Sequence, residues 1–207
     1  MTSRVPTLLS IAFAGLLLPS AAGAQSAAEA DRVIDVDAST VGFTVSAKML
    51  FTVQRHGQFE EFAGVVSYAP NRPGDTRVEL TVYTASVDTH DPTQDALLRS
   101  SNFFDAERFP TMHFISTSAA IVRDRTLTLT GDLTIRNVTK RVAIPLTIVP
   151  SANATATGAT HFETEFDIDR TDFGLNGRPK WKGLDVSIGR KVRIHLAIAT
   201  ITPGQGM

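Results

Sequence analysis

The stretch TLTLTGDLTIRNVTKRVAIPLTIV, residues 126–149, decides the fold class of this chain. In its first half the apolar residues Leu127, Leu129 and Leu133 recur at odd positions, with polar residues between them. Successive side chains of a strand point to opposite faces, so this alternation predicts a strand with one apolar and one polar face. Arg136-Asn137 is a turn signal between two extended arms, and the whole stretch therefore predicts a long hairpin. Long paired strands are typical of barrels rather than of small sandwiches.

The same alternation runs through most of the chain, for example at Val41, Phe43 and Val45. Many such strands predict an antiparallel sheet that packs on a second sheet or closes on itself. Residues 47–58 are ambiguous between a strand extension and a loop. The strands are expected near residues 32–36, 40–47, 63–68, 77–83, 111–117, 119–123, 126–135, 139–149, 160–168 and 186–200.

One helix is expected after Asp91. That residue is a good N-cap, Pro92 suits the first helical position, and Gln94 completes a capping pattern. The helix should end near Arg99 and cover one end of the sheet with its leucines. A second short helix around residues 100–104 is also compatible with the sequence.

The first 24 residues differ from the rest of the chain. They contain one cation, Arg4, then an apolar stretch at Leu8–Leu18, and they end in Ala22-Gly23-Ala24. This is the pattern of a secretory signal peptide, and cleavage is expected after Ala24. The apolar stretch is short for a membrane span, which needs roughly 20 residues. We therefore expect residues 25–207 to form a single exported domain, located in the periplasm.

Composition excludes several classes of function. The chain has 20 Lys and Arg residues against 21 Asp and Glu residues, so no basic excess favours nucleic-acid binding. It has no cysteine, which rules out disulfides, thiolate metal sites and a cysteine nucleophile.

No catalytic pattern is evident, and we expect no enzymatic activity, metal or cofactor. The five histidines form no H-E-x-x-H motif, and Gly-x-Ser-x-Gly and Gly-rich phosphate loops are missing from the sequence. Glu163, Glu165 and Asp167 alternate, as expected for an exposed strand face. Metal ligation by histidines that the fold brings together remains an alternative.

Phenylalanine is unusually common, with 12 residues against two tyrosines and one tryptophan. Its side chain provides a large apolar area without a polar group. This bias fits either a densely packed core or the wall of a lipid cavity, and periodicity alone does not separate the two.

Four segments, in order, resemble the YceI-like family. They are SVDT (86–89), RSSNFFDAERFPTMHF (99–114), GDLTIRNVTK (131–140) and IDRTDFGL (168–175). The resemblance spans roughly residues 33–200. It implies an all-β protein: an extended, lipocalin-like antiparallel β-barrel of about eight strands, with one or two short helices near one end. It also implies an isoprenoid, quinone-type or other long-chain amphiphile inside the barrel, and it brings no catalytic residues.

The chain departs from the family pattern at three places. Asn137 stands where the family usually has glycine, and asparagine tolerates the positive φ that such a turn needs. Ser46-Ala47-Lys48 replaces a segment that often contains histidine, and so does Gln94–Leu98. Without these two histidines the chain lacks any polar contact that they make in the family. We therefore expect the mouth of the barrel to be more apolar here than in the family.

Strand phase predicts which side chains line the barrel. The predicted wall is Phe43, Val45, Leu80, Phe114, Leu129, Leu133, Ile144, Phe162, Phe166, Ile194 and Ile198. Leu196 shares the phase of Ile194 and Ile198.

Four further residues complete the predicted ligand-binding set. Phe104, with Phe103 beside it, should close a mouth of the barrel, and Phe173 lies in the IDRTDFGL motif. Arg170 is expected to clamp backbone segments, with capture of a ligand head group as the alternative. Trp181 belongs to a basic, aromatic loop that could meet an anionic head group at the rim.

Two functions follow from these patterns. The first is an exported carrier or reservoir for an isoprenoid-type lipid. The second is a filled barrel that acts as a structural or stress-related partner of an envelope protein. Exposed strand edges would also allow a homodimer.

Overall fold

The computed structural model describes residues 30–48, 50–149, 160–178, 180–181 and 184–201, so the expected signal peptide lies outside the described residues. Strands dominate, and a single α-helix, α1 (Pro92–Arg99), is found among the described residues. The strands are β1 (Ala30–Lys48), β2 (Thr52–Phe59), β3 (Phe62–Tyr68), β4 (Arg77–Tyr83), β5 (Val87–Asp88), β6 (Thr111–Arg123), β7 (Thr126–Ile135), β8 (Val138–Val149), β9 (Thr160–Asp169), β10 (Lys180–Trp181), β11 (Leu184–Asp185) and β12 (Ser187–Ile201). The 3₁₀ helices are η1 (Pro73–Asp75), η2 (Thr84–Ser86) and η3 (Arg170–Phe173).

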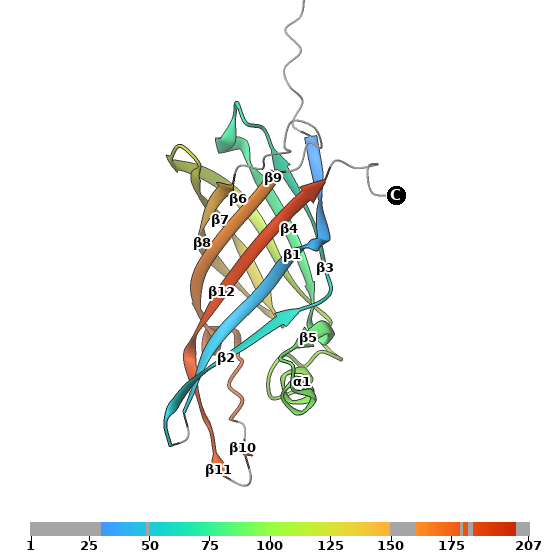
Figure 1. Ribbon diagram of the computed structural model, residues 1–207, viewed down its shortest axis with the longest axis vertical. Helices are drawn as coiled ribbons and strands as arrows, with labels where there is room; N and C mark the ends of the chain where they lie inside the picture. Colours follow the sequence, from blue (N-terminus) through green and yellow to red (C-terminus); the bar gives the residue numbers. More distant parts are fainter. Residues whose placement is uncertain (1–29, 49, 150–159, 179, 182–183, 202–207) are drawn as a thin grey trace, which may run out of the picture.

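Eight strands close into an antiparallel barrel (Figure 1). Their order is β12-β9-β8-β7-β6-β4-β3-β1, and pairing of β12 with β1 completes the circle. Closure leaves each of these strands with a neighbour on both sides, which is how barrels avoid free edges. The predicted fold class is confirmed.

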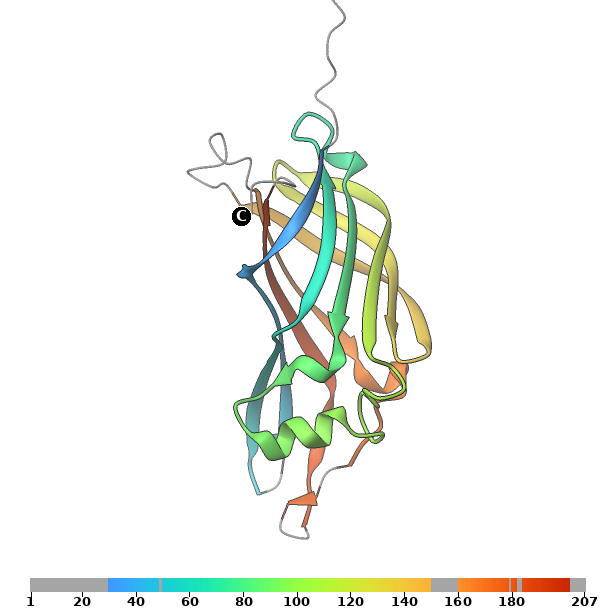
Figure 2. The same ribbon diagram turned by 90° about the vertical axis from the view of Figure 1, so that its right-hand side faces the viewer.

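The first strand, β1, is long enough to have two successive partners on one side. Residues 30–33 pair with β3, whereas residues 41–48 pair with β2. The wall therefore diverges part-way down: β2 leaves the barrel and pairs with β5 at Gln58 and Phe59. Figure 2 shows α1 beside this end of the barrel, which we call the lower end.

Several sequence-based boundaries are corrected. The strands expected near 32–36 and 40–47 are one strand, β1, with an irregularity between Asp35 and Thr40. The two strands expected within 111–123 are likewise one strand, β6. Residues 52–59 form a separate strand, β2, that pairs antiparallel with β1, so most of the ambiguous segment is neither an extension of the preceding strand nor a loop.

Strand β6 contains a bulge. Its register with β7 shifts between Ser116 and Ser118, opposite Gly131. A Cβ atom on Gly131 would lie 2.6 Å from the carbonyl oxygen of Ile115 and from the Phe114 ring. Glycine is therefore required at position 131 for the close approach of β6 and β7. The extra residue of the bulge, Thr117, belongs to β6.

The prediction of a second short helix around residues 100–104 is wrong, because this segment consists of turns. The Phe104 amide donates to the Leu98 carbonyl and the Asp105 amide donates to the Ser100 carbonyl. Asp105 then adopts a φ of 53°, in the left-handed region, which ends any helical continuation.

Candidate functional site

The interior of the barrel contains an apolar cavity of about 130 Å³. Every lining residue except Gly42, His113 and Thr164 has an apolar side chain. His113 is exposed and its ring is hydrogen-bonded to Thr81 and Thr111 at 3.1 and 2.8 Å. The barrel is therefore not filled completely, and the wall of its cavity is almost entirely apolar.

Cross-strand register builds the wall in rows. Phe43 of β1 is opposite Ile194 of β12, and Ile194 is opposite Phe166 of β9. Across the barrel, Leu129 of β7 is opposite Ile144 of β8. Directly opposed residues of paired strands project to the same face, so each row places its large side chains in the interior.

Ten of the fifteen residues predicted to bind a ligand line this cavity. They are Phe43, Leu80, Phe114, Leu129, Leu133, Ile144, Phe162, Phe166, Ile194 and Ile198. That these side chains contact a ligand stays a prediction.

Val45 and Phe104 do not line the cavity. Val45 follows Phe43 on the inner face of β1 but is only half-buried and lies farther toward the lower end. Phe104 packs edge-on against Phe59, with ring centroids 5.5 Å apart, and Phe59 lies 5.8 Å from Phe43. Phe59 and Phe43 do line the cavity, so the three rings form a continuous aromatic series that leads out of it.

Arg170 and Phe173 also lie outside the cavity lining. Arg170 is buried, and its guanidinium donates to the carbonyl oxygens of Gly189 at 2.9 Å, Ile188 at 3.1 Å and Leu175. Burial lowers the pKa of this guanidinium. These bonds favour the backbone clamp over head-group capture, and Phe173 packs in the core. The side chain of Trp181 lies outside the described part of the structure.

Three of the four motif segments meet at the lower end of the barrel. The Arg136 guanidinium lies 3.4 Å from the Asp105 carboxylate and donates to the Gly174 carbonyl at 3.2 Å. The Phe109 ring lies between two guanidinium groups, at 5.3 Å from Arg108 and 5.4 Å from Arg136. The motifs thus join the turns below the cavity.

The turn between β7 and β8 differs in one detail from the expectation. Arg136, with a φ of 56°, is in the left-handed region, whereas Asn137 is not. The contacts of Arg136 with Asp105 and Gly174 hold this conformation, which a non-glycine residue adopts at some energetic cost.

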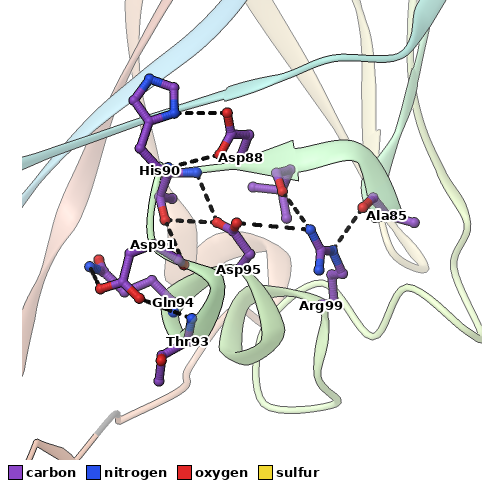
Figure 3. Close-up of polar contacts among 10 residues, drawn as sticks. Ala85, Asp88, His90, Asp91, Thr93, Gln94, Asp95 and Arg99 are labelled. Carbon is purple, nitrogen blue, oxygen red and sulfur yellow. Dashed lines mark hydrogen bonds and ion pairs between the residues drawn. The ribbon is translucent and has the colours of Figure 1, made fainter.

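The fourth motif, SVDT, attaches α1 to the barrel (Figure 3). Thr89 donates from its amide and hydroxyl to buried Asp95, at 2.8 and 2.7 Å. Arg99 donates to the carbonyls of Ala85 and Val87 at 2.8 and 2.9 Å. Polar contacts from the middle and the last residue of α1 therefore hold the helix against β5 and the residues on either side of it.

The predicted cap of α1 is present. Asp91 accepts hydrogen bonds from the amides of Thr93 and Gln94 at 2.9 and 3.3 Å, and from the Gln94 side chain at 2.7 Å. The Gln94 side chain, followed by the Thr93 amide, holds the pKa of Asp91 below its usual value.

Sequence reasoning missed about half of the cavity lining. Most of these residues share the strand phase of residues that were chosen: Val78 and Val82 flank Leu80, and Leu146 follows Ile144. Phase alone could have found them. Phe59 carried no such signal, because the nearest residues of the same phase in β2 are Gly57 and Arg55, neither of which has an apolar side chain. The remaining missed residues are Ile34, Val41, Gly42, Val66, Met112, His113, Ile135, Thr164 and Ile168.

The described residues contain neither a metal-binding cluster nor a helix that could span a membrane. No group of three or more His, Cys, Asp and Glu side chains in this part of the chain is arranged to hold a metal ion. None of the helices described has the length and hydrophobicity that crossing a membrane requires.

Comparison with known families identifies the fold. The YceI-like domain model matches residues 33–200. The chain belongs to the YceI-like family. Protein YceI of Escherichia coli O157:H7 is 31% identical over 170 residues, which cover 82% of this chain and 86% of that protein. The UPF0312 protein of Shewanella denitrificans is 37% identical over 137 residues, or 66% of this chain and 69% of that protein.

Solved structures of the YceI-like fold are also similar. BcnA of Burkholderia cenocepacia superposes with a TM-score of 0.68 at 23% identity, covering 80% of this chain and 98% of that one. A polyisoprenoid-binding domain from Saccharophagus degradans gives a TM-score of 0.65 at 16% identity, covering 84% and 99%. At these identities the likeness concerns the fold alone.

Proposed function

We propose that this YceI-like protein is an exported binding protein that holds an isoprenoid or another long-chain amphiphile in its barrel. The observation that carries the proposal is the apolar cavity, whose wall is built from the inner faces of the strands. Its fold is shared with a domain described as polyisoprenoid-binding. The signal-like pattern of residues 1–24 supports export to the periplasm, followed by cleavage after Ala24.

Burial of a hydrocarbon chain supplies the affinity. Each CH₂ group that leaves water contributes about 0.8 kcal/mol, before the costs of ordering the ligand are subtracted. An engineered cavity of about 150 Å³ accepts a benzene molecule, so the present cavity of about 130 Å³ suits a short hydrocarbon segment. A longer tail must displace side chains, and the aromatic series Phe43, Phe59 and Phe104 is the path along which it would extend.

The test has two parts. Protein purified without detergent is denatured and extracted, and the extract is analysed by mass spectrometry for long-chain lipid. Delipidated protein is then titrated with a fluorescent farnesol derivative, and unlabelled geranylgeraniol is added as competitor. We expect a co-purifying lipid and saturable, competed uptake of the probe. If the extract is free of lipid and the probe is not taken up, the carrier function is wrong.

A further inference from the structure

Arg32 lies on the inner face of the barrel, near the start of β1. It is opposite Val66 of β3, a cavity-lining residue that is 2% exposed. Two residues farther along the same face, Ile34 also lines the cavity. Neither Arg32 nor Tyr68 lines the cavity itself, but both adjoin residues that do, at the upper end and away from the aromatic series.

Two nitrogens of this guanidinium, Nε and Nη1, are buried and lack a hydrogen-bond partner among the described residues. Within the same part of the chain, Arg32 is also missing from the ion pairs. Removing a cation from water without compensation is costly, so buried arginines normally have partners. Arg170 shows the usual arrangement, with its guanidinium bonded to three carbonyl oxygens.

Tyr68 is the polar neighbour of Arg32 at this end. Its ring packs edge-on against Phe162, a cavity-lining residue, with centroids 5.5 Å apart. Burial raises the pKa of the Tyr68 phenol, and the positive charge of Arg32 opposes that rise in part. The phenol is therefore protonated at neutral pH and is able to donate a hydrogen bond, as the guanidinium is.

We propose that Arg32 and Tyr68 form a head-group site for an oxyanion, either a phosphate or a carboxylate, at the upper end of the cavity. The inference rests on the proposed function and specifies the class of amphiphile. A guanidinium offers a rigid set of donors that matches the oxygens of both anions. The bound lipid then lies with its anionic head at Arg32 and its hydrocarbon tail directed toward Phe43 and Phe59.

The test uses three ligands that share one geranylgeranyl tail: the monophosphate, the corresponding carboxylic acid geranylgeranoic acid, and the alcohol geranylgeraniol. Each competes with the fluorescent farnesol derivative on the wild type, on Arg32→Met and on Arg77→Met. Arg77 is exposed on β4, which also begins at the upper end, so it controls for the loss of one cation. We expect the wild type and Arg77→Met to prefer at least one of the two anions over the alcohol by about tenfold or more. Arg32→Met should lose that preference and keep its affinity for the alcohol within about twofold.

The outcomes separate the two proposals. Equal affinity of the wild type for all three ligands, or a preference that survives in Arg32→Met, overturns the head-group site but leaves the carrier function intact. Failure to bind any of the three overturns both. Tighter binding of the phosphate than of the acid assigns the head group to a phosphorylated lipid, and the reverse assigns it to a fatty-acid-like ligand.

A second measurement does not depend on ligand. The ligand-free Arg32→Met protein should melt at a higher temperature than the wild type, because the substitution removes two buried guanidinium nitrogens that lack a partner among the described residues. A lower melting temperature would mean that Arg32 has a structural partner, and would count against the site. Arg32→Gln, which keeps a polar side chain without the charge, repeats the binding test if the methionine variant does not fold.

Discussion

The hydroxyl of Thr164 is an isolated polar atom in an apolar wall. It lines the cavity on β9, between Phe162 and Phe166, and it is buried without a hydrogen-bond partner among the described residues. A buried polar group that makes no hydrogen bond destabilises the folded state relative to an apolar group of the same shape. Thr164 shares the strand phase of Phe162 and Phe166, but its lack of a partner is visible only in the folded chain.

Replacing Thr164 with valine should therefore raise the free energy of unfolding of the ligand-free protein, by about 1 kcal/mol. Urea denaturation followed by circular dichroism measures the change. Thr200→Val is the matched control, because the Thr200 hydroxyl is fully buried but donates to the Thr160 carbonyl at 3.0 Å. That control should lose stability. A loss in both variants would show that Thr164 has a partner in solution.

At the scale of elements, α1 and the segment after it close the lower end of the barrel. The helix is held by Asp91 at its first turn and by Asp95 and Arg99 against β5. Phe104 follows directly and contacts the aromatic series. The cap at Asp91 is a local contact, whereas Phe104 contacts Phe59 from a distant part of the chain.

The hydrogen bonds of Asp91 at the start of α1 predict that the stability of the protein depends on pH in the acid range. The pKa of Asp91 is lower in the folded protein than in the unfolded chain, where it is about 3.9. Its contribution to stability is therefore complete above the unfolded pKa and is lost as the pH falls through the lower, folded pKa. Asp91→Ala should melt at a lower temperature than the wild type at neutral pH, and the difference should shrink below about pH 4. Melting temperatures across the acid range measure it, with the exposed turn residue Asp124→Ala as control. A difference that is constant with pH would contradict the cap.

The aromatic series predicts an effect on exchange rates. Phe104→Leu should speed dissociation of a bound fluorescent farnesol derivative, because it removes a ring that packs against Phe59 at the exit from the cavity. Stopped-flow competition measures the rate. Phe173→Leu changes a similarly buried ring that does not line the cavity, so it should lower stability and leave the dissociation rate near that of the wild type. Equal acceleration in both variants would mean that general loosening, not the exit, controls release.

At the scale of the whole molecule, closure of the sheet creates the interior. The pairing of β12 with β1 joins the last strand to the first, so residues far apart in the chain face one another across the cavity. Leu129 of β7 lies in that wall and is 2% exposed. A larger side chain there should fill the cavity from one side.

Leu129→Trp should therefore abolish uptake of the farnesol probe while the protein still folds, with a loss of about 1–3 kcal/mol from overpacking. Fluorescence titration and far-ultraviolet circular dichroism report the two effects. Ile115→Trp is the control, because Ile115 is 50% exposed on the outer face of β6 and should bind the probe as the wild type does. Undiminished uptake by a folded Leu129→Trp protein would place the ligand outside the cavity.

The strand pattern was accessible from the sequence because alternation is a local property. It located the hairpin of β7 and β8 and ten of the lining residues, and the equally local capping pattern located the start of α1 at Asp91. It failed where the outcome depended on distant partners. Phe59 enters the wall only because β1 exchanges β3 for β2, and Arg136 takes the left-handed conformation because Asp105 and Gly174 hold it.

The amino-acid sequence by itself determined that this chain forms long amphipathic strands and belongs with YceI-like barrels. Periodicity and the order of motifs are properties of the linear chain and do not depend on its tertiary contacts. The volume of the interior, the clamp made by Arg170 and the isolation of Arg32 were decided only by the tertiary structure. Each of these depends on which side chains from separate strands meet when β12 pairs with β1, and packing distances between such residues are not encoded in any single segment.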